Sequence, residues 1–243
     1  MFFVLAVSLG AADFWQAKPF ADWNDKDVKK MLENSPWARP VNVSGDLVAP
    51  WSGGKRGANG RGSMGEIGNG TEAPPNPMDD APRSGVGRAA QNADPDRATA
   101  PAVTFTVRWE SALPVRQARV RAKYGSEAAT SAEVKRVLEA EEPNYVITVS
   151  GLGPDAMRGD AAEIKKRAIA GAALIVKGKD PIKPVDFMLE RGKGAAIGMF
   201  AFPKNAPLTI DDKEVEFSAH FDSIPVKQKF QFKTMVLGGK LEL

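Results

Sequence analysis

Residues 213–233 read KEVEFSAHFDSIPVKQKFQFK, and only here does the sequence specify how two strands pair. Apolar and polar residues alternate on both sides of residues 222–225, as they do in two strands that each bury one face. With residues 222–225 as the loop, Phe217 is expected to lie opposite Phe230. Since a slip of one residue would turn every phenylalanine to solvent, the alternation predicts an antiparallel hairpin with one apolar face.

The composition bounds the class of the protein. Of its 243 residues, 43% are hydrophobic, which is enough for a sizeable core. Lys and Arg total 33 and Asp and Glu total 30, without a block of like charge, so the composition argues against a nucleic-acid partner. The chain has no cysteine and a single histidine, which excludes thiolate chemistry and leaves little room for zinc sites or histidine catalysis. We therefore expect no catalytic residue, no metal site and no cofactor.

Residues 1–12 read MFFVLAVSLGAA, an apolar run that ends in small residues. This is the pattern of the apolar region and cleavage site of a secretory signal, with cleavage before Asp13. The basic residues that normally precede such a run are missing, and a start assigned too far downstream would explain that. The alternative is a buried N-terminal strand or helix. The run is shorter than the roughly 20 residues of a transmembrane helix, so we expect a secreted or periplasmic protein without a transmembrane segment.

The best local helix signal begins at Asn24, placed as the N-cap, with Asp27 in the capping-box position. Ser35-Pro36 is expected to end this helix, because the residue before a proline avoids helical geometry. Four of the five tryptophans lie within the first 51 residues. Their rings either line a ligand cleft by stacking or dock the helix onto a sheet, and docking is the favoured interpretation.

Four segments stand out along the chain: Phe20-Ala-Asp-Trp23 to Ser35-Pro-Trp-Ala-Arg-Pro40, Val107-Arg-Trp-Glu-Ser-Ala-Leu-Pro-Val115, Phe200-Ala-Phe-Pro203 and Gly239-Lys-Leu-Glu-Leu243. Together they resemble a family of uncharacterised secreted bacterial proteins. The resemblance covers both ends and the middle of the chain and includes no catalytic motif. It implies export and a shared fold, and it assigns neither an activity nor a site residue.

Residues 52–101 differ from the rest of the chain, with ten Gly, six Pro and no aromatic residue. Such a segment cannot bury enough surface to offset its ordering entropy, so it is predicted to be disordered. Strands are expected on both sides of it, at 41–48 and 103–109. Because residues 13–51 are too few to fold alone, we expect them to supply the first helix and strand of one domain, whose main part is 102–243.

A helix is expected from Ser111, with Pro114 in its first turn. Its outward face carries four basic side chains, Arg116, Arg119, Arg121 and Lys123. This face either holds an anion or is a solvated helix surface, and solvation is the commoner case. A second helix is expected after Thr130 and Glu133, which have the spacing of a capping box.

Further along, strands at 145–150 and 172–177 flank a helix capped by Asp160, an order that makes a βαβ unit if the strands share a sheet. The turn at 151–156 matches the glycine pattern of a dinucleotide site. Lysines stand where the ribose-binding acid is needed, so a tight turn is the favoured interpretation. From Pro181 onward the pattern is that of strands.

Two polar features near the C-terminus are candidate sites. Asp211, Asp212 and Glu214 form a carboxylate cluster that either binds calcium or makes a polar turn, and their spacing favours the turn. His220 is expected on the polar strand face beside Lys227, where a catalytic triad would have to assemble on an exposed sheet. We therefore assign no catalytic role to His220.

The sequence as a whole predicts an α+β fold, with a mostly antiparallel sheet and three or four helices on one face. The expected function is that of an exported, non-catalytic protein that binds or scaffolds an unknown macromolecule or a component of the cell envelope. Two alternatives remain open. A small-ligand carrier would have a pocket between helices and sheet, and a hydrolase would have two carboxylates converging in a cleft. The sequence favours a protein that is not an enzyme and leaves its ligand unknown.

Overall fold

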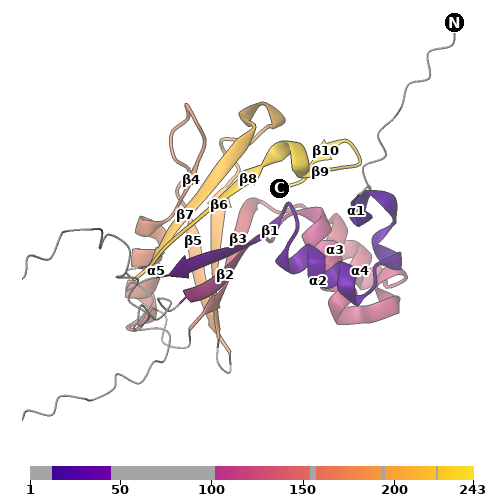
Figure 1. The fold of residues 1–243 in the computed structure, drawn as a ribbon, viewed down its shortest axis with the longest axis horizontal. Helices are drawn as coiled ribbons and strands as arrows, with labels where there is room; N and C mark the ends of the chain where they lie inside the picture. Colours follow the sequence, from indigo (N-terminus) through magenta and orange to yellow (C-terminus); the bar gives the residue numbers. More distant parts are fainter. Residues whose placement is uncertain (1–12, 45–101, 154–156, 193–194, 223) are drawn as a thin grey trace, which may run out of the picture.

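A computed structural model of the chain describes residues 13–44, 102–153, 157–192, 195–222 and 224–243 (Figure 1). The expected signal sequence, 1–12, and the expected disordered insertion, 52–101, lie outside these residues. The predicted α+β class is confirmed, since the described chain combines helices with antiparallel strand pairs. No helix in the described ranges is both long and apolar enough to cross a membrane.

Five strands form the larger sheet, in the order β1-β2-β3-β6-β5. Their bounds are Ala38–Ser44 (β1), Ala102–Trp109 (β2), Asn144–Leu152 (β3), Asp186–Arg191 (β5) and Ala196–Pro203 (β6). β1 pairs with β2 so that Val43 lies opposite Val103. The strands expected on the two sides of the insertion are therefore neighbours, as predicted, and the first of them begins at Ala38 rather than at residue 41.

The smaller sheet has the order β4-β7-β8. Its strands are Ala173–Ile175 (β4), Glu214–Phe221 (β7) and Ile224–Gln231 (β8). The predicted hairpin is confirmed as β7 and β8, which pair antiparallel. Its apolar side chains form one buried face, with Phe217 at 0% and Phe230 at 1% exposure, while His220 on the other face is exposed.

The predicted register of this hairpin is wrong by two residues, since Phe217 lies opposite Gln228 and not Phe230. Two residues connect the strands in place of the expected four, and the first of them, Asp222, has a φ of 54°. Two-residue hairpin turns need positive φ, which Asp adopts more readily than most residues. Because a shift of two leaves every side chain on its own face, the buried face is nevertheless the predicted one.

The strand, helix and strand of residues 144–175 do not form a βαβ unit. Helix α5 (Ala161–Gly171) is capped by Asp160 as predicted, but β4 pairs antiparallel with β7 and lies in a different sheet from β3. Gly151 lies at a bulge in β3 rather than in a tight turn. Its φ is 88°, and a Cβ there would lie 2.6 Å from the Thr104 carbonyl oxygen, so β2 approaches too closely for any other residue. The rest of the expected dinucleotide motif, 154–156, lies outside the described residues.

Aromatic rings fill the space between the two sheets, which face each other. The ring of Phe217 on β7 contacts Phe200 and Phe202 on β6, with centroids 5.5 and 6.3 Å apart. Trp109 on β2 contacts Phe230 on β8 at 5.4 Å. These side chains are at most 1% exposed. The structure thus has two facing sheets where the sequence suggested one.

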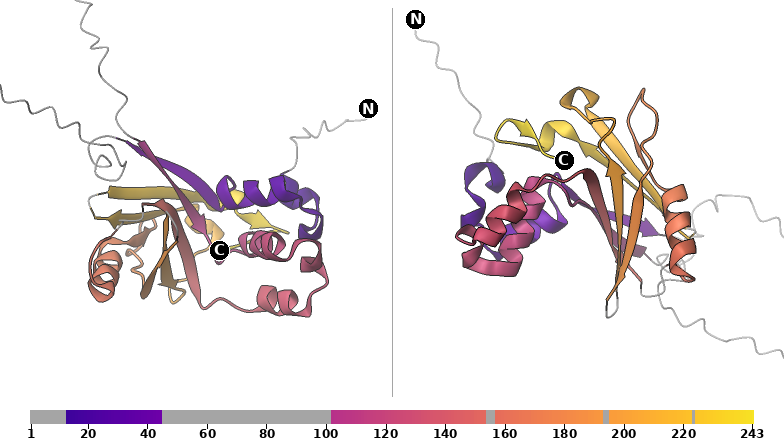
Figure 2. Two further views of the ribbon diagram at one scale, coloured as in Figure 1. Left: turned by 90° about the horizontal axis from the view of Figure 1, so that it is seen from below. Right: turned by 180° about the vertical axis from the view of Figure 1, so that it is seen from behind.

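The helices lie at the ends of the facing sheets (Figure 1; Figure 2). α5 lies at one end. The opposite end carries a helical cluster, made of α1 (Phe14–Ala17), η1 (Phe20–Asp22), α2 (Asp25–Glu33), α3 (Leu113–Tyr124), η2 (Gly125–Ala129) and α4 (Ala132–Glu139). This arrangement replaces the expected covering of one sheet face, and it leaves the strand ends near the cluster free to line a site.

The start of α2 and the tryptophans are as predicted. The side chain of Asn24 accepts a hydrogen bond from the Asp27 N–H at 3.1 Å, and the Asp27 carboxylate accepts one from the Asn24 N–H at 3.0 Å. The four described tryptophans are all buried: Trp15, Trp23, Trp37 and Trp109. Trp15 and Trp37 meet edge to face at 5.8 Å, so the rings dock the helical cluster rather than line an open cleft. Trp51 lies outside the described residues.

Candidate functional site

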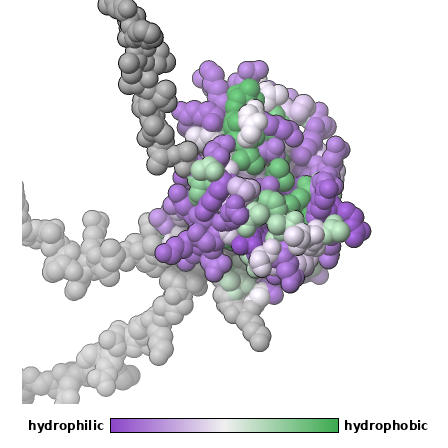
Figure 3. Space-filling model, turned by 90° about the vertical axis from the view of Figure 1, so that its right-hand side faces the viewer, coloured by the Kyte–Doolittle hydropathy of each residue, from purple (hydrophilic) through white to green (hydrophobic). Residues whose placement is uncertain are grey.

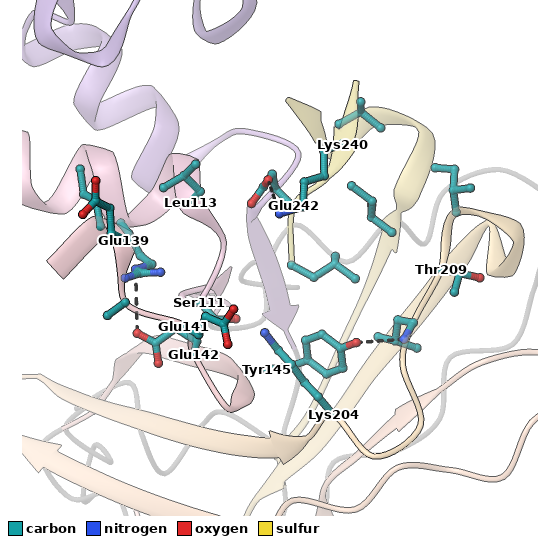
Figure 4. A pocket seen from close by; sticks show the side chains of 18 of the residues that line it. Ser111, Leu113, Glu139, Glu141, Glu142, Tyr145, Lys204, Thr209, Lys240 and Glu242 are labelled. Carbon is teal, nitrogen blue, oxygen red and sulfur yellow. Dashed lines mark hydrogen bonds and ion pairs between the residues drawn. The ribbon is translucent and has the colours of Figure 1, made fainter. Parts of the chain in front are cut away.

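A groove of about 900 Å³ lies between the helical cluster and the C-terminal end of the chain (Figure 4). One wall consists of the start of α3 and residues 138–142, at and after the end of α4. The other wall consists of residues 208–210 and a short terminal hairpin, β9 (Val236–Leu237) and β10 (Lys240–Leu241). Tyr145 of β3 and Lys204 lie between the walls and form the floor.

The helical wall is fixed to β3 by hydrogen bonds. The Ser111 hydroxyl, just before α3, accepts the N–H of Val146 at 3.0 Å. The Arg116 guanidinium donates to the Val137 carbonyl and lies 3.9 Å from the Glu142 carboxylate, so α3 holds the end of α4. The N-cap of α4 is Ser131, which accepts the N–H of Val134, and not the predicted Thr130. The prediction of a side-chain cap at the start of this helix is therefore correct, but the N-cap lies one residue later than predicted.

The opposite wall depends on contacts with the N-terminal part of the chain. Gly238 and Gly239 connect β9 and β10 with φ of 57° and 81°, the positive values that a two-residue hairpin turn needs. The Trp37 indole donates a 2.8 Å hydrogen bond to the Glu242 carbonyl, and Lys240 forms an ion pair with the Glu242 carboxylate at 3.6 Å. The hairpin is thereby held beside the helical cluster.

The floor of the groove presents a lysine over a tyrosine. The Lys204 Nζ lies 5.0 Å from the centroid of the Tyr145 ring, a cation–π geometry. Burial lowers the pKa of Lys204, and the positive charge of Arg116 adds to this effect although Glu142 opposes it. The Tyr145 hydroxyl accepts the Leu208 N–H at 2.9 Å, and burial raises the pKa of this phenol.

The lining of the groove mixes charged and aliphatic side chains. The charged side chains are Arg116, Glu139, Glu141, Glu142, Lys204, Lys240 and Glu242. The aliphatic ones are Leu113, Leu138, Leu208, Ile210, Val236, Leu241 and Leu243. From the side of the helical cluster, the surface shows a band of apolar side chains bordered by hydrophilic ones (Figure 3). A ligand of this groove therefore meets both classes of side chain.

The basic face predicted for α3 is solvated only in part: Arg119 and Lys123 are exposed, whereas Arg116 and Arg121 are half-buried. Arg119 forms an ion pair with the buried Glu110, and Arg121 donates to the Trp23 carbonyl at 2.9 Å. Burial opposes ionisation of Glu110, but the charges of Arg108 and Arg119 outweigh it and hold the pKa of Glu110 below its ordinary value. The favoured interpretation of a solvated face is therefore correct only in part, because Arg119 and Arg121 also bind a carboxylate and a backbone carbonyl.

The carboxylate cluster is a polar turn, as favoured from its spacing. Asp212 accepts the Thr209 N–H at 2.8 Å within η3 (Ile210–Asp212) and forms an ion pair with Lys179. Burial opposes ionisation of Asp212, but the hydrogen bond from Lys179 and its charge outweigh it, so the pKa of Asp212 is lowered. In the described ranges, no three His, Asp or Glu side chains gather as potential metal ligands.

His220 is exposed, with its Nδ1 3.4 Å from the Gly171 carbonyl oxygen. Its partner across the hairpin is Pro225, so the expected position beside Lys227 is wrong. The cause is the same two-residue shift in the register of the hairpin. The structure therefore brings His220 together with none of the groove residues.

Sequence reasoning did not find the groove. Its residues come from three separate parts of the chain, 111–145, 204–210 and 236–243, and no local pattern joins them. Comparison of the chain with protein-family models, with curated proteins and with solved structures finds no match in any of the three.

Proposed function

We propose that this protein is an exported, non-catalytic binding protein, and that its groove binds an extended segment of a partner protein. Export rests on the apolar pattern of residues 1–12. Binding rests on the groove, each of whose two walls is fixed by its own hydrogen bond. Ser111 bonds to β3 on one wall, and Trp37 bonds to Glu242 on the other. A preformed groove needs no ordering of its own when a partner binds.

The observation that carries this proposal is the mixed lining of an open groove. Sites for small molecules are enclosed and mostly apolar, with a few polar groups. Here the lining as a whole has as many charged side chains as large aliphatic ones. A polypeptide segment has the same mixture, because its backbone is polar and its side chains alternate in character.

The groove supports binding better than it supports carboxylate catalysis. A hydrolase needs two carboxylates that converge on one reacting bond. In the groove, Glu142 is ion-paired with Arg116 at 3.9 Å and Glu242 with Lys240 at 3.6 Å. These two pairs lie on opposite walls (Figure 4).

Selection from a displayed library of random peptides tests the proposal. Ile210 lines the groove and is 48% exposed, so Ile210→Arg should obstruct the groove without disturbing the core. Met188 on β5 is 60% exposed and is absent from the groove lining, which makes Met188→Arg a matched control. We expect selected peptides to bind the unmodified protein and Met188→Arg equally, and to bind Ile210→Arg at least about tenfold more weakly.

A library that yields no binding peptide would overturn the proposal. Selected peptides that bind Ile210→Arg as well as they bind Met188→Arg would also overturn it, because binding would then lie outside the groove. Thermal unfolding of both variants checks that each one is folded.

A further inference from the structure

We infer that Lys204 and Tyr145 form a carboxylate-binding subsite in the groove, which takes an acidic side chain of the partner segment between aliphatic neighbours. This inference rests on the proposed function and specifies what the groove recognises. The two side chains face the same space from the floor of the groove (Figure 4).

Lys204 is the cation of the groove whose charge is not matched by an ion pair. Arg116 and Lys240 each pair with a glutamate. Within the described chain, no carboxylate lies within ion-pair distance of Lys204, which is half-buried over the Tyr145 ring. A half-buried ammonium group is poorly hydrated, so an anion that reaches it gains more than it would at an exposed lysine.

Tyr145 supplies a second donor on the same floor of the groove. The residue is 4% exposed, and its hydroxyl accepts the Leu208 N–H, which leaves its proton without an acceptor among the described residues. Since burial raises its pKa, the phenol stays protonated and can donate. A buried donor without an acceptor is costly, and a bound acceptor group removes that cost.

The charges around the floor select a carboxylate over a phosphate. Glu142 and Glu242 are used by their ion pairs, so one negative charge suffices to match Lys204. Glu139 and Glu141 also line the groove, and they repel the nearly two charges of a phosphate more strongly than the single charge of a carboxylate. An Asp or Glu side chain brings one charge and two acceptor oxygens.

Aliphatic side chains lie on both sides of this subsite. Leu113 and Leu138 belong to the helical wall, and Leu208 and Ile210 to the opposite wall. In an extended segment, residues on either side of the acidic one would reach these walls. The recognised segment is therefore an acidic residue with aliphatic residues close to it in sequence.

A double-mutant cycle on peptides from the library tests the inference. We expect the selected peptides to share an Asp or Glu near aliphatic residues, and replacing it by Asn or Gln should weaken binding about tenfold. Lys204→Met, which keeps an apolar side chain of similar length, should weaken binding of the acidic peptide by a similar factor. Combining both changes should weaken binding no further, because the same contact is removed from both sides. Lys204→Arg should restore the preference for the acidic peptide.

The outcomes separate this inference from the proposed function. Peptides that bind in the groove, as judged by Ile210→Arg, but need no acidic residue would overturn the inference alone. Additive losses in the cycle would do the same. If no peptide is selected and dodecanoate binds in native mass spectrometry in a manner that Lys204→Met abolishes, the carboxylate belongs to a lipid, and both proposals fail in favour of a small-ligand carrier.

Discussion

The indole N–H of Trp37 donates a 2.8 Å hydrogen bond to the backbone carbonyl of Glu242, 205 positions further along the chain. Gln16 makes a second link of this kind, from its side-chain amide to the Val236 carbonyl. The terminal hairpin that forms one wall of the groove is therefore held by the N-terminal part of the chain. This relationship makes the groove a property of the whole folded chain rather than of its C-terminal end.

Replacing Trp37 by phenylalanine should loosen this wall. Loss of the hydrogen bond and of part of a fully buried ring should cost about 2 kcal/mol in the free energy of unfolding. Amide hydrogen exchange of residues 236–242 should accelerate as well. Trp15→Phe is the control, since it reduces a neighbouring buried ring without removing that hydrogen bond. Equal exchange at the hairpin in both variants would show that Trp37 does not hold it.

The ion pairs of Glu110 are expected to matter far more than a surface pair. Its side chain is 10% exposed and accepts hydrogen bonds from Arg108 and Arg119. Glu110→Ala leaves both arginines without their buried partner and should cost about 3 kcal/mol by urea unfolding. Glu33→Ala, which breaks an exposed pair with Lys29, should change stability by less than about 0.5 kcal/mol. Similar values for the two variants would mean that the buried network adds nothing.

Glu110 should also contribute to the loss of stability in acid. Its pKa in the folded protein is below the ordinary value of 4.5, so the unfolded chain binds its proton first as the pH falls. The stabilisation is complete above about pH 4.5 and is lost as the pH falls through the folded pKa. We therefore expect stability to fall less between pH 7 and pH 3 in Glu110→Gln than in the unmodified protein. Parallel profiles of the two proteins in urea unfolding would contradict this.

Gly151→Ala should be strongly destabilising because of both backbone and space. Its φ is 88°, and the added Cβ would lie 2.6 Å from the Thr104 carbonyl oxygen. We expect a cost of about 3 kcal/mol. Gly178 has a φ of 80° but no atom within 4 Å of the corresponding Cβ position, so Gly178→Ala should cost only about 1 kcal/mol. Thermal or urea unfolding of the two variants isolates the effect of the close approach.

Two substitutions in β7 test the alternation of its faces. Phe217 is 0% exposed and contacts Phe200 and Phe202, so Phe217→Ala should cost about 3 to 5 kcal/mol. His220 is exposed on the other face, and His220→Ala should stay within about 0.5 kcal/mol. Equal destabilisation by both in urea would mean that the strand is buried on both faces.

Features that depend on neighbours along the chain could be predicted from the sequence. The capping pair Asn24 and Asp27 could be predicted because a capping box joins residues three positions apart. The buried face of β7 could be predicted because side chains alternate along a strand, whichever strand pairs with it. The α+β class followed from these local signals taken together.

The pairing of the elements and the position of the groove depend on contacts between distant parts of the chain. A loop of two residues and a loop of four both leave Phe217 on the buried face, so alternation could not distinguish Gln228 from Phe230 as its partner. In the structure the loop has two residues, and Asp222 adopts the positive φ that such a turn needs. The hydrogen bond from Arg121 to the Trp23 carbonyl could not be predicted either, because the two residues are 98 positions apart. The subsite depends in the same way on non-local packing. Tyr145 and Lys204 are 59 positions apart and carry no shared pattern, because their juxtaposition results from the pairing of β3 with β6 and not from any local preference of the chain.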